Sequence, residues 1–293
     1  MKTIPDLEVH ALELIRRTST QLPEDIRTCL LDGRKNEAEG SAAEASLDTI
    51  LENVELAGKQ STPICQDTGT PVFYIDHPWD YPTAPMVEAI RIAVQEATKL
   101  SYLRPNSVDS VSGKNTGDNS GHHFPGFYFQ QWDRPDEIRI RLMLKGGGSE
   151  NMSAQYSLPH GGLKAGRDLD GVRKVILDAV LQAQGKGCGP AVLGICIGGD
   201  RSSGYSLAKK QILRNVEDRN PDPELAALED EMTEKSNQLG IGPMGFGGRT
   251  TVLTSKICKA NRVPASFFVS IVYMCWAARQ REMRFSKGEV LHD

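Results

Sequence analysis

Three consecutive segments within the first sixty residues place their apolar side chains three and four positions apart. They are residues 6–19 (DLEVHALELIRRTS), 23–36 (PEDIRTCLLDGRKN) and 41–60 (SAAEASLDTILENVELAGKQ). This spacing predicts amphipathic α-helices, and Asp, Pro and Ser stand where helices commonly begin. Because an amphipathic helix has an apolar face to bury, the chain must supply a second layer for these helices to pack on.

Strand-like patterns follow the helical segments. Residues 72–75 (VFYI) form an apolar run, residues 137–145 (EIRIRLMLK) alternate polar and apolar side chains, and residues 190–199 (PAVLGICIGG) are typical of a buried strand. Residues 249–280 add two β-branched or aromatic runs. These segments predict the β-strands of the second layer.

Helical patterns recur between these strands, without a regular β-α-β period or an internal repeat. They lie at residues 81–101, 168–187, 206–216 and 221–240. We therefore predict an α+β fold in which an N-terminal helical layer packs with a mostly antiparallel sheet.

The length of 293 residues fits one large domain or two modest ones. We expect a single domain of residues 1–293, and its alternative is a helical lobe of residues 1–60 with an α+β lobe of residues 61–293. Residues 103–123 have no period and are rich in Gly, Asn, Ser and Asp. A loop of that length in a compact domain is usually functional or disordered.

The charge of the chain bears on its partners. A net charge of -4 and the absence of any polybasic tract argue against a nucleic-acid-binding protein, so we expect a small molecule or another protein as partner. No apolar run reaches the roughly 18 residues of a membrane span, and the N-terminus is amphipathic rather than a signal peptide. We therefore expect a cytoplasmic protein.

Six cysteines are spread along the chain rather than crowded into a small scaffold. They are Cys29, Cys65, Cys188, Cys196, Cys258 and Cys275. This distribution is not typical of a secreted disulfide protein. No Cys-x-x-Cys or His-x-x-x-His pair is present, so a metal site would have to be assembled from remote segments.

The stretch TPICQDTGTPVFYID, residues 62–76, contains the turn Asp-Thr-Gly-Thr. An acid protease has such a turn, but it needs two carboxylates that share a proton, and this chain has one such turn, preceded by Cys65 and Gln66. A simpler alternative is that Asp67 closes an Asx-turn before a strand.

Cys65, Cys188 and Cys275 stand at corners where a backbone turn can present a thiolate: Cys65 and Cys188 each lie between a helix and a strand, and Cys275 ends the last apolar run. Cysteine thiolates hold iron–sulfur clusters, and a cluster with three protein ligands keeps one iron open to substrate. The alternative is that each cysteine is a small buried apolar residue.

Seven motifs follow one another along the chain. They are CQDTGTPVF (65–73), LRPNSVD (103–109), GKNTGDNSG (113–121), KGGGSENMSA (145–154), NPDPELAALEDEM (220–232), LGIGPMGFGG (239–248) and CWAARQ (275–280). In this order they resemble the alpha-type catalytic domain of the iron–sulfur hydro-lyases, the family of class I fumarate hydratase and L(+)-tartrate dehydratase. The resemblance runs from about Asp6 to Arg281, nearly the whole chain.

The resemblance implies a [4Fe-4S] cluster ligated by Cys65, Cys188 and Cys275. In the family the fourth iron has no cysteine and coordinates the substrate, which helps the hydroxyl group to leave. The other three cysteines match no ligand position and are expected to be structural.

Further family positions imply contacts with a dicarboxylate. Gln66 and Asp67 match substrate-contacting residues, and Asp67 is a candidate for proton transfer. Arg104 matches an arginine that grips a substrate carboxylate, for which a planar guanidinium is suited, whereas the residue by itself would indicate a surface ion pair. Gly148 matches a position where the backbone approaches the substrate, a role that favours a residue without Cβ. A phosphate-binding loop is the competing interpretation of these glycines, but no Gly-Lys-Ser/Thr follows them.

Lys114, Asn115 and Thr116 match a family motif and are expected to support the site from behind. His122 and His123 lie in the same loop, where adjacent histidines are more often solvated. Two positions depart from the family pattern. Val263 stands where a histidine is usual, and Gly189 replaces a usual proline after Cys188, which leaves room for an altered substrate preference or impaired activity.

In the family a smaller beta-type domain completes the catalytic unit. We expect this chain, which ends at Asp293, to be an alpha subunit that needs a beta-type partner, in a heterotetramer of two alpha and two beta chains. The resemblance favours reversible hydration of fumarate to (S)-malate. L(+)-tartrate dehydratase is the first alternative, because the two substrates differ by one hydroxyl. A non-catalytic cluster-binding or regulatory homologue is the second.

Overall fold

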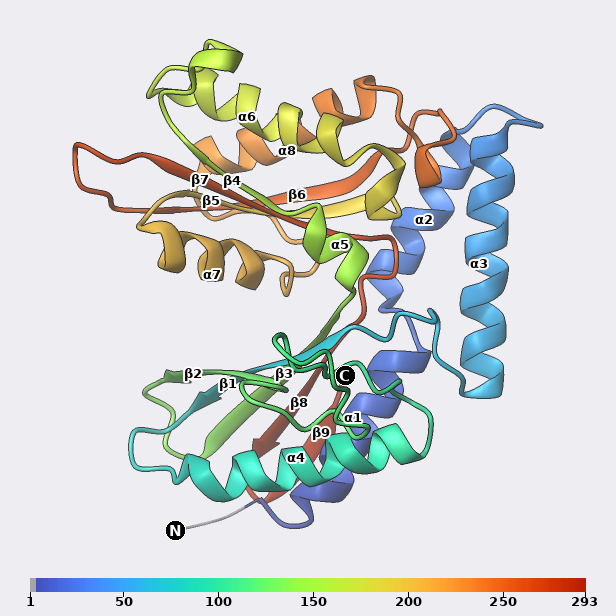
Figure 1. Ribbon diagram of the computed structural model, residues 1–293, viewed down its shortest axis with the longest axis vertical. Coiled ribbons are helices and arrows are strands. Elements are labelled where there is room, and N and C mark those ends of the chain that lie inside the picture. Colours follow the sequence, from blue (N-terminus) through green and yellow to red (C-terminus); the bar gives the residue numbers. More distant parts are fainter. Residues whose placement is uncertain (1–3) are drawn as a thin grey trace. The chain divides into compact units, whose positions relative to one another are not determined.

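A computed structural model describes residues 4–293 (Figure 1). The chain forms two compact units, and segments of the two units alternate along the sequence. Of the described residues, unit 1 comprises 4–23, 53–147 and 279–293, and unit 2 comprises 24–52 and 148–278. The three N-terminal helices are therefore divided between the two units. No helix of the described residues is long and apolar enough to cross a membrane.

Unit 1 is built on a five-stranded sheet with the order β2-β1-β3-β8-β9. Its strands are β1 (Thr70–His77), β2 (Gly126–Gln131), β3 (Glu137–Lys145), β8 (Gln280–Ser286) and β9 (Glu289–His292). Strands β1 and β2 run parallel, and the other pairs are antiparallel.

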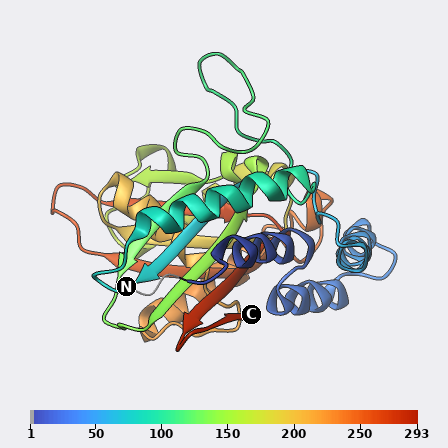
Figure 2. The same cartoon turned by 90° about the horizontal axis from the view of Figure 1, so that it is seen from below.

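Helices α1 (Leu7–Thr20) and α4 (Thr83–Lys99) lie next to each other against this sheet, as both Figure 1 and Figure 2 show. The buried residues of α4 recur with the helical period and are Met86, Ile90, Ala93, Val94 and Ala97. They share one core with the buried residues of α1 and with apolar side chains of β1, β3 and β8. Helix α1, the first of the predicted helices, therefore packs on the sheet of unit 1.

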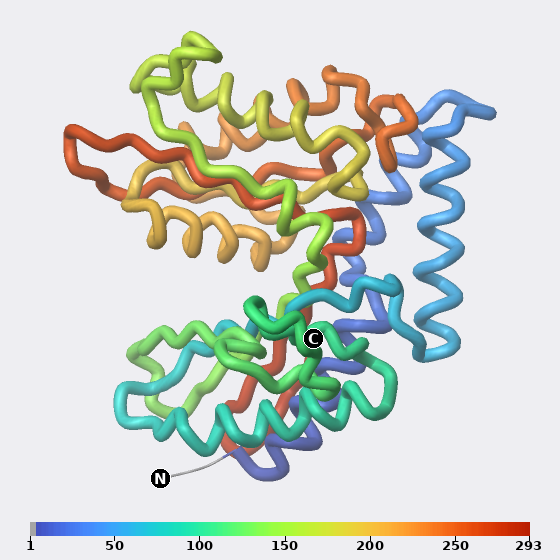
Figure 3. Tube along the Cα trace, in the orientation of Figure 1, coloured from blue at the N-terminus to red at the C-terminus, as the bar shows by residue number. Residues whose placement is uncertain are grey.

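Unit 2 is built on a four-stranded sheet with the order β4-β7-β5-β6. Its strands are β4 (Ala154–Ser157), β5 (Ala191–Gly198), β6 (Val252–Ala260) and β7 (Phe268–Met274). Strands β5 and β6 run parallel, while β4 and β5 are each antiparallel to β7, which lies between them. The chain traces of β4 and β7 run side by side in Figure 3. Residues 191–198 are all buried, as expected for a central strand.

Helices cover both faces of this sheet. Helices α6 (Leu169–Ala183) and α8 (Pro223–Gln238) share a core with β5, β6 and β7, and α7 (Arg201–Gln211) lies on the opposite face (Figure 1). The other helices are α2 (Glu24–Asn36), α3 (Ala42–Gln60), the short α5 (Gly147–Asn151), and the single 3-10 turns η1 (Gly161–Leu163), η2 (Gln184–Gly187) and η3 (Pro243–Gly245).

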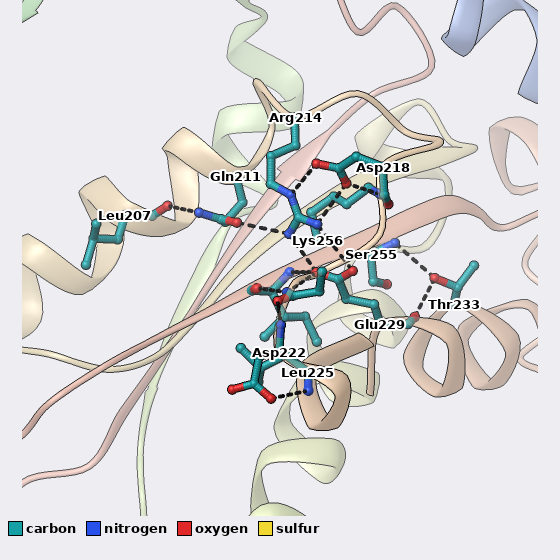
Figure 4. A network of polar contacts seen from close by, with 12 residues as sticks. Leu207, Gln211, Arg214, Asp218, Asp222, Leu225, Glu229, Thr233, Ser255 and Lys256 are labelled. Carbon is teal, nitrogen blue, oxygen red and sulfur yellow. Dashed lines mark hydrogen bonds and ion pairs between the residues drawn. The ribbon is translucent and has the colours of Figure 1, made fainter. Parts of the chain in front are cut away.

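A buried polar network attaches α8 to β6 (Figure 4). The Glu229 carboxylate accepts hydrogen bonds from Arg214 Nη1 at 2.7 Å, from Asn220 Nδ2 at 2.8 Å and from the Ile257 amide at 2.7 Å. Lys256, whose side chain is 3% exposed, donates to the carbonyl and the carboxylate of Asp218. Because the buried charges are paired and hydrogen-bonded, the network fixes the position of α8.

The α+β fold class is confirmed, with mostly antiparallel pairing divided between two sheets. The predicted helices and strands are present, but the prediction of a helix at residues 206–216 was wrong by five residues. Helix α7 begins at Arg201, because the Asp200 carboxylate accepts hydrogen bonds from the amides of Ser202 and Ser203 and the Ser203 hydroxyl caps in return. This capping box decided where the helix starts.

Candidate cofactor and substrate site

In unit 1, the turn between α3 and β1 contains Asp67, whose two carboxylate oxygens both accept hydrogen bonds. Oδ1 accepts a hydrogen bond from the Gly69 amide at 3.0 Å, which forms the expected Asx-turn. Oδ2 accepts a second bond from the Gly147 amide at 2.7 Å. Both carboxylate oxygens are thus fixed by backbone N–H groups, and the side chain keeps partial exposure to solvent.

Gly69 allows this corner to approach strand β3. Its φ of +77° is in the left-handed region, and a Cβ added there would lie 2.7 Å from the carbonyl carbon of Lys145. The next residue, Thr70, pairs directly with Lys145 in the sheet. Only glycine fits this backbone conformation and spacing without strain.

The long loop of residues 103–123 folds back onto the same corner through its first residues. Thr68, which is fully buried, accepts hydrogen bonds through Oγ1 from the Arg104 amide at 3.0 Å and from Asn106 Nδ2 at 3.1 Å. Asn119, also buried, bonds to the Asn106 amide and the Arg104 carbonyl. This part of the loop is therefore ordered by specific contacts rather than disordered.

The Arg104 guanidinium is exposed and lies beside Gln66. Its Nη1 is 3.4 Å from the Gln66 carbonyl oxygen, a long hydrogen bond. The structure thus brings three of the predicted residues, Gln66, Asp67 and Arg104, together in unit 1. The three-residue stretch 114–116 lies further along the loop.

The stretch Lys114–Thr116 is exposed, and the loop projects beyond α4 in Figure 2. Asn115 Nδ2 donates to the Pro105 carbonyl at 2.8 Å, and the Thr116 amide donates to the Ser107 carbonyl at 2.9 Å. These bonds close a small hairpin within the loop. The supporting role of the three residues stays a prediction.

In unit 2, Cys188 stands in a strained turn between η2 and β5. Its φ of 53° and ψ of 59° are in the left-handed region, which is unusual for a residue with a Cβ. A Cβ added at Gly187 would lie 2.4 Å from the Tyr273 ring, and one at Gly189 would lie 3.1 Å from its hydroxyl oxygen. Packing against Tyr273 therefore favours glycine on both sides of Cys188, including Gly189, for which the resemblance implied a proline. Backbone strain of this kind is found mainly at functional sites.

Cys275 lies next to this turn, directly after the last residue of β7. The amide of Trp276 donates to the Cys188 carbonyl at 3.1 Å, which brings the two cysteine segments together. Burial raises the pKa of the Tyr273 phenol, and the nearby Cys275 and Cys188 raise it further. The structure thus brings two of the three predicted ligands together in unit 2, whereas Cys65 belongs to unit 1.

The three predicted ligands are thiols outside disulfides with partial exposure, a property that they share with Cys29 and Cys258. Cys196 is fully buried and faces Cys258 across β5 and β6, where the hydrogen bond with Cys196 and burial raise the pKa of Cys258. Accessible thiols outside disulfides are the donors that an iron–sulfur cluster needs, so this donor set fits such a group. Within residues 4–293, no group of three His, Cys, Asp or Glu side chains lies close enough to hold a metal ion by itself.

Two further predicted positions differ in what surrounds them. A Cβ added at Gly148 would have its nearest neighbour 3.9 Å away, so the protein alone does not require glycine there, and its contact with substrate stays a prediction. Val263 is 65% exposed and precedes β7, whereas Cys275 follows it. Roughly 20 Å of strand separates these two residues, so a side chain at position 263 does not contact Cys275 within unit 2.

Sequence reasoning missed Arg279, Thr68 and Asn119. Arg279 is 1% exposed, and its Nη2 donates to the Asp67 carbonyl at 2.8 Å. A charged residue directly after a long apolar run was the available signal for Arg279. Thr68 and Asn119 gave no signal, because a single polar residue in a Gly-rich turn does not reveal its burial.

Comparison with known proteins identifies relatives along nearly the whole chain. Residues 9–284 match the family model described as fumarate hydratase (fumerase). A putative fumarate hydratase class I of Geobacillus stearothermophilus is 52% identical over 284 residues, which cover 95% of this chain and 55% of the relative. The chain thus spans about half the length of that relative.

Two further relatives are named as subunits. A putative L(+)-tartrate dehydratase subunit alpha of Methanocaldococcus jannaschii is 37% identical over 273 residues, which cover 92% of this chain and 94% of the relative. The L(+)-tartrate dehydratase subunit alpha of Escherichia coli strain K12 is 30% identical over 264 residues, which cover 89% of this chain and 85% of the relative.

Proposed function

Because the chain belongs to the fumarate hydratase (fumerase) family, we propose that it is the alpha-type catalytic part of an iron–sulfur hydro-lyase that reversibly hydrates fumarate to (S)-malate. The observation that carries this proposal is the corner of unit 1, where Gln66, Asp67 and Arg104 lie together beside Cys65. A side-chain amide and an exposed guanidinium can donate hydrogen bonds to substrate carboxylates, and a fixed carboxylate can transfer a proton.

We propose Cys65, Cys188 and Cys275 as the ligands of a [4Fe-4S] cluster. The family implies a metal or iron–sulfur cofactor, and three partly exposed thiols outside disulfides support the cluster. When bound, the cluster supplies a Lewis-acidic iron that stabilises the oxygen leaving the substrate. Thiolate ligands require a reducing surrounding, so a cytoplasmic location belongs to the same proposal.

The chain's own side chains bind the substrate and move the proton. Arg104 is exposed and offers a planar set of donors to one substrate carboxylate. Asp67 is the proposed proton-transfer group, because its two oxygens are held by the amides of Gly69 and Gly147 and a proton there has a fixed position. Gln66 and Gly148 complete the proposed contacts with the substrate, and Lys114, Asn115 and Thr116 support them from the long loop.

We propose that a beta-type chain or domain completes the site, in a heterotetramer of two alpha and two beta chains when the two are separate. The names of the two subunit-alpha relatives support a partner of this kind. They also support the second candidate, dehydration of L(+)-tartrate, because the chain covers 94% and 85% of those relatives.

Turnover by the assembled enzyme tests this proposal. The chain is co-expressed with its beta-type partner, reconstituted with iron and sulfide without oxygen, and assayed with fumarate, (S)-malate and L(+)-tartrate. We expect kcat/KM for fumarate and malate to exceed that for tartrate by about tenfold or more. The opposite order would assign the chain to tartrate. A cluster-loaded pair that turns over none of the three would make it a non-catalytic homologue.

Exposure to air gives a second readout of the same enzyme. Activity should decay in air and recover after treatment with iron and a reductant, because an iron open to substrate is also open to oxidants. Air-stable activity would contradict an open cluster.

A further inference from the structure

Arg279 is a buried cation whose hydrogen-bonding capacity is mostly unused. The side chain is 1% exposed, and Nη2 donates to the Asp67 carbonyl at 2.8 Å. Nε and Nη1 are buried and have no hydrogen-bond partner in the described part of the chain. A guanidinium carries five N–H donors, so a single acceptor leaves it far from satisfied.

The charge of Arg279 also lacks a carboxylate at ion-pair distance among residues 4–293. Burying a cation without a close partner lowers the stability of the folded state. The contrast within unit 1 is Arg141, which is also largely buried but forms an ion pair with Asp76 at 3.1 Å. Arg141 fits a structural role, whereas Arg279 costs stability that its one hydrogen bond does not offset.

Arg279 lies beside the carboxylate that the proposed reaction uses. A Cβ added at Gly146 would be 3.1 Å from Asp67 Oδ2 and 3.8 Å from Arg279 Nη2, so the two charged groups flank the same glycine. The Arg279 carbonyl accepts a hydrogen bond from the Leu144 amide at 3.0 Å, which ties the residue to the end of β3. The cation is therefore held in place by the sheet and not by an ion pair.

We propose that Arg279 is a positioning residue for the reaction: it anchors the Asp67 main chain, and its buried charge offsets that of Asp67 so that the corner accepts an anionic substrate. This inference rests on the proposed function. A dicarboxylate carries two negative charges, and an isolated Asp67 carboxylate would repel it. In a buried surrounding the opposing cation is weakly screened and acts over several ångströms.

Substitution of Arg279 separates the charge from the hydrogen bond. Arg279→Lys keeps the charge, Arg279→Gln keeps a donor for the Asp67 carbonyl without the charge, and Arg279→Met removes both. Arg141→Gln is the matched control, because it removes a buried but paired arginine from the same unit. Each variant is measured in the assembled, reconstituted enzyme for kcat and KM and in the full chain for thermal unfolding.

We expect Arg279→Gln to unfold at a temperature no lower than that of the wild type, because it removes an unpaired buried charge. Its KM for the dicarboxylate should rise about tenfold or more, with kcat within about threefold of the wild-type value. Arg279→Lys should restore KM to within about threefold, and Arg279→Met should also lose kcat. Arg141→Gln should lower the unfolding temperature and leave KM unchanged.

The outcomes for Arg279 and for the proposed function can be told apart. If the wild-type pair is active and Arg279→Gln retains the wild-type KM, or loses activity only in proportion to lost stability, Arg279 is structural and the inference is wrong. If the wild-type pair turns over no dicarboxylate, the proposed function fails instead. Substrate binding to the inactive Asp67→Asn pair, measured by calorimetry, gives an independent check. There Arg279→Gln should weaken binding much less, because Asp67 no longer carries the charge to be offset.

Discussion

Asp67 is the residue on which the contacts of unit 1 converge. Its carboxylate accepts hydrogen bonds from the amides of Gly69 and Gly147, and its main-chain carbonyl accepts one from the Arg279 guanidinium. The three contacts come from segments about eighty and two hundred positions away in the sequence as well as from its own turn. A group that is to transfer a proton must be held within a small fraction of an ångström, and this arrangement fixes it on both sides.

Gly69 offers a direct test of how tightly the corner is built. Gly69→Ala should lower the free energy of unfolding by about 3 kcal/mol, because the new Cβ meets the β3 backbone and the left-handed conformation is strained. Gly113→Ala is the matched control, since Gly113 has a φ of +71° with nothing within 4 Å of an added Cβ. It should cost about 1 kcal/mol, for the conformation alone. Urea unfolding measures both, and equal losses would show that the corner is looser than described.

Some helices and strands of this chain can be predicted from the apolar pattern of the sequence, and others cannot. The periodic apolar residues of α1 and α4 were sufficient to predict both helices. The start of α7 depended on the Asp200 cap, which the apolar pattern does not include. The last hairpin was missed, although Lys287 and Gly288 both have positive φ and Gly is typical of such a two-residue turn. Polar residues alternate with few apolar ones in β8 and β9, because these strands lie toward the edge of the sheet.

The network between α8 and β6 makes stability depend on pH. Burial alone would raise the pKa of Asp218, but hydrogen bonds from Arg214 and Lys256 outweigh it and hold the pKa below the ordinary value of 3.8. A carboxylate with a lowered pKa contributes stability above its ordinary pKa, and the contribution is lost as the pH falls through the folded-state value.

We therefore expect Asp218→Asn to lower the unfolding temperature between pH 5 and pH 7, by an amount that shrinks below about pH 4. Calorimetry of both proteins across this range measures the difference. Asp230→Asn, on the exposed face of α8, is the control and should have little effect at any pH, because its ion pair with Arg219 is exposed at both partners. A constant deficit for Asp218→Asn at all pH values would contradict the assigned cause.

At the scale of the whole molecule, the fold class followed from local patterns but the division into units did not. Strand β8 pairs with β3, whose residues lie about 140 positions earlier, and both belong to unit 1. Periodicity reports which face of a strand is buried and contains no information on its partner, so the interleaving of the units could not be read from the sequence. The same limit applies to Arg279, whose burial depends on contacts with two remote segments.

The cysteines illustrate what the motifs added. By position alone, Cys65, Cys188 and Cys275 stood at turns that could present a thiolate, but each could also be a small core residue. The structure separates Cys196 and Cys258, which face each other within one sheet, from Cys188 and Cys275, which lie at the same turn. The assignment of Cys65, Cys188 and Cys275 to one cluster rests on the family and stays a proposal.

The visible absorption of the chain after reconstitution with iron and sulfide without oxygen tests that proposal most directly. The variants are Cys65→Ser, Cys188→Ser and Cys275→Ser, with Cys29→Ser as the control, because Cys29 is a partly buried cysteine outside the proposed ligand set. We expect the wild type and the control to show iron–sulfur absorption, and each of the three ligand variants to lose most of it while keeping the far-ultraviolet circular dichroism of the folded chain. Full cluster absorption in any of the three ligand variants would contradict the account.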